Sequence, residues 1–256
     1  MPRALNAAAA LLLLLCGDAR AEWTVVSSGQ QGAGRAGVVH LEATTTDSES
    51  GARATLHLAV FSPKSATLRV IDDAEARPTL AETMQRENAV AGVNGGYFEP
   101  DYAPLGLLIS DGRTVAPLRK ARLLSGILSA AGGRVYIQRV AEYSAKAKPT
   151  AARQCGPFLV DRGVPVPGLN ATRAARRTFV ATAGADRATI GYSSHLTLAQ
   201  IADVLATPGL IPGAKVERAL NLDGGSSSGF WFAGNGAPFS IREQKTVRDF
   251  IAVVPR

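Results

Sequence analysis

Short apolar runs, separated by glycine, proline and polar residues, dominate the chain from residue 54 onward. Runs of this kind are typical of strands buried in a sheet. They predict strands at residues 54–61, 67–71, 89–93, 105–110, 123–129, 134–140, 156–160, 177–183, 189–192, 216–222 and 251–254. Asp111-Gly112 and Gly132-Gly133 are turn signals between neighbouring strands. The polar segments 44–51 and 143–153 are predicted to be loops.

Two segments show helical spacing instead. In residues 78–87, Thr79 can cap a helix because Glu82 follows three positions later. Thr197 can cap a second helix, which carries apolar residues on one face and ends before Pro208. Many short strands with a few helices predict an α+β fold, a single layered domain of mixed β-sheets with the helices packed on them.

The first residues follow a different pattern. The apolar run 7–15 precedes Ala19-Arg20-Ala21, a small-x-small sequence typical of signal cleavage. We expect residues 1–21 to be a secretory signal peptide and residues 22–256 to be one exported domain, periplasmic or secreted. Cys16 leaves lipoprotein processing open as an alternative, although the residue before it is not small. No transmembrane segment is expected elsewhere.

The composition is basic, with 28 Lys and Arg against 21 Asp and Glu and a net charge of +7. Removal of the signal would lower this charge by one. The basic residues are scattered except for Arg173, Arg176 and Arg177, and no aromatic residues alternate with them. A nucleic-acid partner is therefore not expected. Attraction to anionic glycans, phosphates or lipid headgroups is a better match for an exported basic protein.

Cysteine chemistry has little scope in this sequence. If Cys16 leaves with the signal, Cys155 is the only cysteine, and no internal disulfide can form. Cys155 is either a small buried thiol at the start of a strand or a nucleophile. No histidine stands at a recognisable spacing from it, which weakens the second interpretation.

The strongest candidate for chemistry is Asp223, which follows a predicted strand and precedes Gly224, Gly225, Ser226 and Ser227. Backbone N–H groups and hydroxyls in such a turn can surround an anion, while the carboxylate can act as a base or a nucleophile in a hydrolytic reaction. The alternative is an ordinary turn aspartate that accepts hydrogen bonds from its own backbone. No metal-ligand spacing of His, Cys, Asp and Glu is present. A calcium-like divalent cation near Asp223 is a further option, held by backbone and serine oxygens.

A second small-residue turn lies upstream, at Asn94-Gly95-Gly96-Tyr97-Phe98. Asn-Gly is also a common hairpin signal, so this segment has a purely structural interpretation. In the functional interpretation, Asn94 presents its amide to a polar substrate and Tyr97 or Phe98 forms a wall for a sugar ring. Two such turns in one chain suggest one site built from two strand ends.

The third candidate is Arg177, which enters an apolar strand together with Thr178. A cluster of basic residues usually marks a solvated face. At the mouth of a strand, however, an arginine suits bidentate recognition of a phosphate.

Taken in order, these motifs resemble the phosphodiester glycosidase family of uncovering-enzyme-like domains, in its short bacterial exported branch. The resemblance covers residues 54–254. It is carried by Asn94–Phe98, Pro104–Leu107, Cys155–Pro157, Arg176–Phe179, Leu196–Leu198 and Asn221–Ser227. It implies hydrolysis of a sugar-1-phosphodiester in a cleft where the motifs meet, and site roles for Asn94, Arg177, Thr178, Asp223, Gly224 and Ser226.

These considerations give a working hypothesis for a carbohydrate or glycan-phosphate substrate in envelope or exopolysaccharide metabolism. Arg177 and the N–H groups around Gly224–Ser226 would hold the phosphate, Asp223 would act on the sugar as base or nucleophile, and Asn94 would orient a sugar hydroxyl. Glu99 and Asp101 are the nearest candidates for a second carboxylate. The alternative is a non-catalytic envelope module that binds glycan or cell wall through the same residues.

Overall fold

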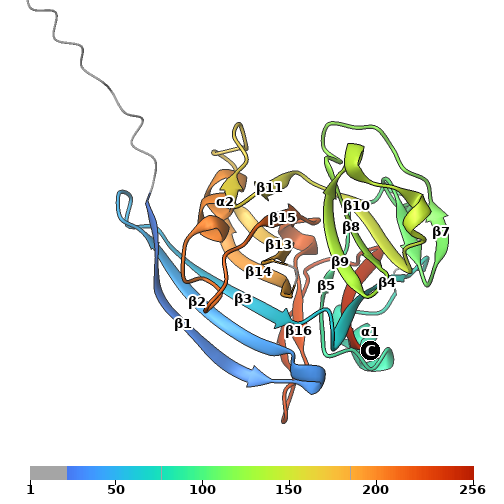
Figure 1. Ribbon diagram of the computed structural model, residues 1–256, viewed down its shortest axis with the longest axis horizontal. Helices are drawn as coiled ribbons and strands as arrows, with labels where there is room; N and C mark the ends of the chain where they lie inside the picture. Colours follow the sequence, from blue (N-terminus) through green and yellow to red (C-terminus); the bar gives the residue numbers. More distant parts are fainter. Residues whose placement is uncertain (1–21, 76, 185) are drawn as a thin grey trace, which may run out of the picture.

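The computed structural model describes residues 22–75, 77–184 and 186–256 (Figure 1). The expected signal peptide, with Cys16, lies outside the described residues. Eighteen strands and two α-helices are found in the described part, so the protein is richer in β-structure than a balanced α+β domain. Neither helix of this part is long and apolar enough to cross a membrane.

Three sheets make up the structure. The eight-stranded sheet has the order β1 (Trp23–Ala33), β2 (Val39–Asp47), β3 (Arg53–Phe61), β14 (Ala188–Leu196), β13 (Ala175–Thr182), β15 (Arg218–Asn221), β11 (Phe158–Asp161) and β12 (Val164–Pro165). One five-stranded sheet contains β7 (Arg113–Ala116), β6 (Leu108–Ser110), β10 (Ala151–Cys155), β8 (Gly126–Ala131) and β9 (Arg134–Arg139). The other contains β17 (Phe239–Ile241), β16 (Phe230–Phe232), β5 (Ala91–Asn94), β18 (Asp249–Pro255) and β4 (Ala66–Asp72).

All the strand pairs in these sheets are antiparallel, rather than mixed as the sequence pattern predicted. The largest core cluster joins all three sheets, because Phe61, Val93 and Leu128 all contribute to it. Each such fully buried apolar side chain stabilises the fold by about 1.5–3 kcal/mol. In Figure 1, β1–β3 sweep away from the body along the left of the view.

Both helices begin where the sequence predicted. Helix α1 (Leu80–Arg86) has a capping box between Thr79 and Glu82. Helix α2 (Leu198–Ala206) is capped by Thr197 in the same manner and packs its apolar face on the eight-stranded sheet. Helix α1 packs on β5, where the absence of a side chain at Gly92 leaves room for Met84: a Cβ there would lie 2.1 Å from the Met84 sulfur.

Most of the predicted strands are confirmed, but the two predicted loops are partly wrong. Residues 44–47 belong to β2, and Thr45 and Asp47 are buried there. Threonine is favoured in strands, so this polar stretch extends the sheet by pairing with β1 on one side and β3 on the other. Residues 151–153 belong to β10, in which Arg153 is completely buried. Seven strands were not predicted: β1, β2, β7, β10, β12, β16 and β17.

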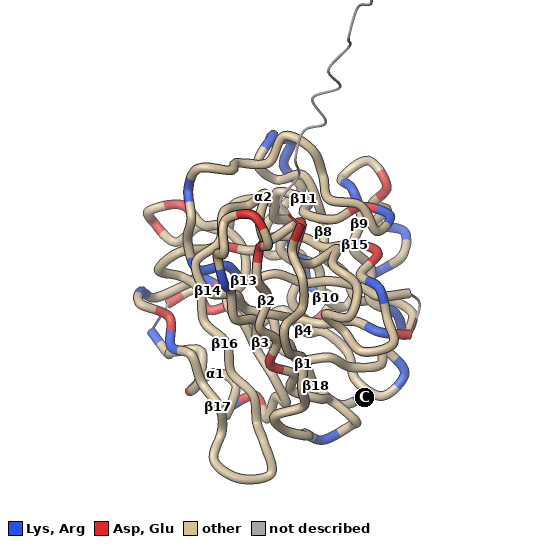
Figure 2. The backbone as a smooth tube through the Cα atoms, turned by 90° about the vertical axis from the view of Figure 1, so that its left-hand side faces the viewer, with Lys and Arg blue, Asp and Glu red and all other residues tan. Residues whose placement is uncertain are grey.

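Lys and Arg positions are spread around the outline of the molecule in Figure 2, interleaved with acidic positions. This agrees with the scattered basic residues of the sequence and gives no single basic face in that view. The distribution of charge in that view therefore does not by itself mark a functional site.

Candidate active site

The two small-residue turns lie side by side. Asn94 ends β5, and Asp223 follows the end of β15, which belongs to a different sheet. The Asn94 side-chain amide donates to the backbone oxygen of Asp223 at 2.7 Å. In return, the Asp223 N–H donates to the backbone oxygen of Gly95 at 3.1 Å. Segments separated by 129 residues are thus hydrogen-bonded directly to each other.

Thr178 completes this buried junction. Its hydroxyl lies 2.9 Å from the Asn94 Oδ1 and 2.9 Å from the Asp223 backbone oxygen. The Gly229 N–H also donates to the Asn94 Oδ1, at 3.3 Å. Since Asn94 is 1% exposed and protein groups occupy both ends of its amide, it is well suited to hold the two turns together. Its expected contact with a sugar hydroxyl stays a prediction.

The Asp223 carboxylate is the point where this network reaches toward solvent. Its Oδ1 accepts the Gly224 N–H at 3.0 Å, and its Oδ2 accepts the Ser227 hydroxyl at 2.5 Å. The first bond is the ordinary turn interaction considered above. Burial raises the pKa of Asp223 above its usual value, against the lowering effect of the Ser227 hydrogen bond. A carboxylate with a raised pKa is a better proton acceptor than an exposed one.

Arg177 lies beside the same turn. Its Nε donates to the Leu196 backbone oxygen at 3.1 Å, and its Nη2 donates to the Arg173 backbone oxygen at 2.8 Å. Its Nη1 lies 3.3 Å from the position that a Cβ on Gly224 would take. Burial lowers the pKa of Arg177, but an arginine remains charged. Two bonds therefore fix the guanidinium so that Nη1 lies next to the glycine of the Asp223 turn.

The two aromatic residues of the Asn94 turn have different environments. The Tyr97 hydroxyl donates to the Gly156 backbone oxygen at 2.6 Å, and burial raises the pKa of this phenol. Phe98 stacks on Tyr102 with ring centroids 5.2 Å apart, and the Lys245 ammonium lies 5.0 Å from the Phe98 centroid. Both residues are partly exposed, but the Tyr97 hydroxyl bonds inward, whereas the Phe98 ring borders a cation.

A buried ion pair that the sequence analysis missed supports the Asn94 turn through hydrogen bonds to its backbone. Arg153 and Asp249 are both 0% exposed, and the Arg153 Nε lies 3.0 Å from the Asp249 Oδ1. The same carboxylate oxygen accepts the Gly96 N–H at 3.1 Å, while the Arg153 Nη2 donates to the Tyr97 backbone oxygen at 2.6 Å. The backbone of the turn is thus held by both charges.

The glycines of this turn are explained by the ion pair. A Cβ at Gly95 would lie 1.7 Å from the Asp249 Oδ1, and one at Gly96 would lie 2.5 Å from the Arg153 Cζ. Their expected role in substrate binding stays a prediction, because the close approach of Arg153 and Asp249 already requires glycine. A single arginine beside an apolar run was the available sequence signal, but it did not identify its partner.

The loop before β18 was also missed. The Gln244 N–H donates to the backbone oxygen of Ser226 at 2.7 Å, which joins this loop to the Asp223 turn. Residues 242–246 line a hollow of about 490 Å³ together with residues 77–79. Attraction to the Lys245 ammonium opposes the effect of burial on the pKa of Asp223. Lys245 is thus a cation that acts on the carboxylate itself, whereas Arg177 lies next to Gly224 of the same turn.

Cys155 is a core residue, at the end of β10 rather than at the start of a strand. Burial raises the pKa of its thiol to about 12. A thiol that stays protonated near neutral pH is a poor nucleophile, so the structure favours the buried-thiol interpretation.

A cation site at Asp223 also stays a prediction. In the described ranges, no three His, Cys, Asp or Glu side chains come together as a metal-ligand group. Any ion at this point would need backbone and hydroxyl oxygens as ligands.

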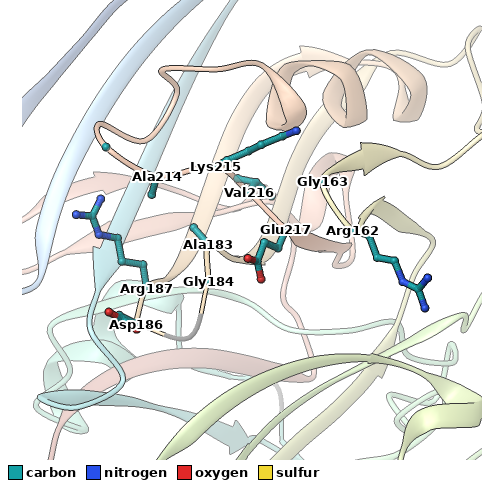
Figure 3. Close-up of a pocket in the computed structure, with 11 residues that line it drawn as sticks. Arg162, Gly163, Ala183, Gly184, Asp186, Arg187, Ala214, Lys215, Val216 and Glu217 are labelled. Atoms are coloured by element: carbon teal, nitrogen blue, oxygen red, sulfur yellow. The ribbon is translucent and has the colours of Figure 1, made fainter.

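A hollow of about 580 Å³ lies elsewhere (Figure 3). It is lined by Lys215 and Glu217, just before β15, and by Arg162 and Gly163 between β11 and β12. Asp223 follows the other end of β15, so this hollow and the candidate active site lie at opposite ends of one strand. Its charges are of both signs, as Figure 3 shows for Lys215 and Glu217.

The antiparallel sheets bring Asp223, which follows β15, and Asn94, at the end of β5, next to Thr178 and Arg177 of β13. They define a β-rich structure with a polar candidate site. Residues 87–254 match the model of the phosphodiester glycosidase family, and the chain belongs to this family.

Solved structures share this fold at low sequence identity. The catalytic domain of zebrafish N-acetylglucosamine-1-phosphodiester alpha-N-acetylglucosaminidase, auto-inhibited by its pro-peptide, superposes with a TM-score of 0.65 at 16% identity, over 90% of this chain and 89% of that one. A hypothetical protein from Synechocystis gives 0.60 at 17% identity, over 86% of this chain and 62% of that one. A putative exported protein from Burkholderia pseudomallei K96243 gives 0.57 at 14% identity, over 81% and 75%.

Among curated proteins, the uncharacterized protein YigE from Escherichia coli K12 is 30% identical over 98 residues. That match spans 36% of this chain and 39% of YigE.

Proposed function

We propose that the protein is an exported hydrolase that cleaves the bond between a sugar anomeric carbon and a phosphodiester oxygen, in envelope or exopolysaccharide metabolism. Membership of the phosphodiester glycosidase family supports the reaction class. The observation that carries the proposal for this chain is the direct hydrogen bonding of the Asn94 turn to the Asp223 turn. This bonding brings Asp223, which follows a strand of the eight-stranded sheet, next to Asn94, which ends a strand of a five-stranded sheet.

In the proposed reaction, Asp223 accepts a proton from a water molecule whose oxygen attacks the anomeric carbon. The bond between the anomeric carbon and the bridging oxygen breaks, and this oxygen leaves with the bonding electrons as part of a phosphate monoester. A phosphate is a good leaving group, so the site has mainly to stabilise its developing charge. Arg177 is assigned this role because its guanidinium is fixed beside Gly224. Asn94 and Thr178 hold the Asp223 backbone in place.

The test is hydrolysis of a panel of sugar-1-phosphodiesters, with released sugar measured for the wild type and for Asp223→Asn. We expect the variant to keep its fold and to lose about a thousandfold or more in turnover, as for removal of a catalytic base with its charge. Asp111→Asn is the matched control, since Asp111 is an exposed turn residue with a left-handed backbone that asparagine tolerates.

Near-normal turnover by Asp223→Asn would remove Asp223 from the mechanism. Tight binding of the diesters by the wild type without release of sugar would instead support the non-catalytic glycan-binding alternative.

A further inference from the structure

The segment between β7 and β8 combines positive charge with exposed apolar side chains. Residues 117–123 read Pro-Leu-Arg-Lys-Ala-Arg-Leu and contain no acid. Leu118 is 42% exposed and Leu123 is 48% exposed, and the three cations between them are exposed as well. We call residues 117–123 the basic–apolar loop; in Figure 1 they connect β7 to β8. Large aliphatic side chains beside cations at the surface call for an explanation.

The basic–apolar loop is held in one conformation by a buried glutamine. The Gln154 Oε1 accepts the N–H groups of Arg119 and Leu107, each at 3.0 Å. The Gln154 Nε2 donates to the backbone oxygens of Arg119 at 2.6 Å and Leu124 at 3.1 Å. Because the two bonds to Arg119 and the one to Leu124 fix the loop before any ligand arrives, its binding would carry little ordering cost.

Two contacts place the basic–apolar loop beside the candidate active site. A Cβ on Gly156 would lie 2.2 Å from the Leu123 backbone oxygen, and the Gly156 oxygen accepts the Tyr97 hydroxyl at 2.6 Å. The Arg119 guanidinium lies 3.7 Å from the carboxylate of Glu99, which is two residues after Tyr97. The loop therefore borders the Asn94 turn.

The charges of the loop are only partly balanced. Glu99 neutralises Arg119 in part, since both side chains are about half exposed. Lys120 and Arg122 form no ion pair with an acid of the described residues. Cations near an anionic bilayer are attracted to its headgroups, and adjacent leucines can enter the boundary between headgroups and acyl chains. A soluble polyanion would use the cations but not the leucines.

We propose that the basic–apolar loop docks this protein on an anionic lipid surface. Together with the proposed function, on which this second step rests, docking would bring the Asp223 site to sugar-1-phosphodiesters whose other alcohol is a lipid. In that reaction the water oxygen bonds to the anomeric carbon, the sugar is released, and the lipid keeps a phosphomonoester and its negative charge.

The test is sedimentation of the purified protein with sucrose-loaded vesicles of phosphatidylcholine and phosphatidylglycerol, against vesicles of phosphatidylcholine alone. We expect binding to the anionic vesicles only. The double variant Lys120→Glu/Arg122→Glu should bind about 25-fold more weakly or worse, at about fivefold for each cation removed. Leu118→Ser/Leu123→Ser should bind about tenfold more weakly.

The matched control is Lys64→Glu/Arg134→Glu, which changes the net charge equally at two exposed sites outside the loop. It should bind within about threefold of the wild type, because salt screens distant charges. Equal weakening by the control and the loop variant would overturn the proposal, as would equal binding of wild type to both vesicle types. Wild-type binding by the leucine variant would also overturn it and would favour a soluble polyanionic glycan.

This measurement needs no turnover, so it stands whether or not the protein hydrolyses any sugar diester. The second step is tested by comparing a water-soluble diester with one carried on the vesicles. Loop variants should keep the activity on the soluble diester and lose it on vesicles about in proportion to their binding. Equal rates on both substrates would reject the lipid-borne substrate while leaving the hydrolase proposal intact.

Discussion

Replacing Asp249 with asparagine tests whether the buried ion pair supports the Asn94 turn. The substitution keeps the size of the side chain and an oxygen that can still accept the Gly96 N–H. It removes the negative charge opposite Arg153, whose Nε and Nη2 lie 3.0–3.1 Å from the two carboxylate oxygens. Both partners are 0% exposed, so water cannot replace the lost charge.

Removing one partner of a buried pair leaves the other charge without compensation and costs about 3–5 kcal/mol. Asp72→Asn is a close control, because Asp72 is the direct neighbour of Asp249 across β4 and β18. Its partner Arg248 lies 2.8 Å away, but the Arg248 side chain is 11% exposed and the Asp72 side chain is 19% exposed. We expect Asp72→Asn to cost about 1 kcal/mol, as for an ordinary hydrogen bond.

Urea unfolding, followed by the fluorescence of the two tryptophans, gives both free energies by linear extrapolation. Asp249→Asn should also lower hydrolysis of a sugar diester, because the Asn94 turn loses its support. Equal stability costs for the two variants, or a cost of about 1 kcal/mol or less for Asp249→Asn, would refute the argument from burial.

Three further outcomes follow from the site and the core. Arg177→Ala should keep the fold and lower kcat/KM for a sugar diester by about 100-fold in steady-state kinetics, as for loss of one charge-stabilising donor. Cys155 should react with a thiol reagent only on unfolding, and alkylating conditions should leave hydrolysis unchanged, because burial raises its pKa to about 12. His40 and His57 lie 3.2 Å apart in the core, and burial lowers the pKa of each to about 4. Below about pH 6.5 the unfolded chain therefore binds protons that the folded chain does not bind. Urea unfolding should show that the free energy of unfolding falls by about 2 kcal/mol per imidazole from pH 7 to pH 5.

Local signals were sufficient for the elements that depend on local chemistry. The capping pairs of Thr79 with Glu82 and Thr197 with Gln200 lie within one helical turn, and the structure shows both. Buried strands such as β3 and β18 carry apolar runs long enough to be recognised. The two turns that supply Asn94 and Asp223 were visible for the same reason.

What could not be predicted depends on partners far away in the chain. Arg153 and Asp249 are separated by 96 residues, so neither sequence context reveals the other. Strand β1 is mostly exposed and is rich in serine, glutamine and glycine, and only its pairing with β2 makes it a strand. Lys245 approaches the Asp223 turn through the fold of its loop, which no local pattern specifies.

The position of the site depends on the register of β5. Asn94 pairs with Phe250 of β18, and a shift by one residue would turn the Asn94 side chain to the other face of its sheet. Two contacts fix this register: Met84 occupies the space above Gly92, and Asp249 holds the backbone beyond Asn94. One contact is apolar packing and the other is a buried charge. The residues that stabilise this sheet are therefore also those that bring Asn94 to Asp223, which explains why a charged pair is found within a core where apolar residues would pack at lower cost.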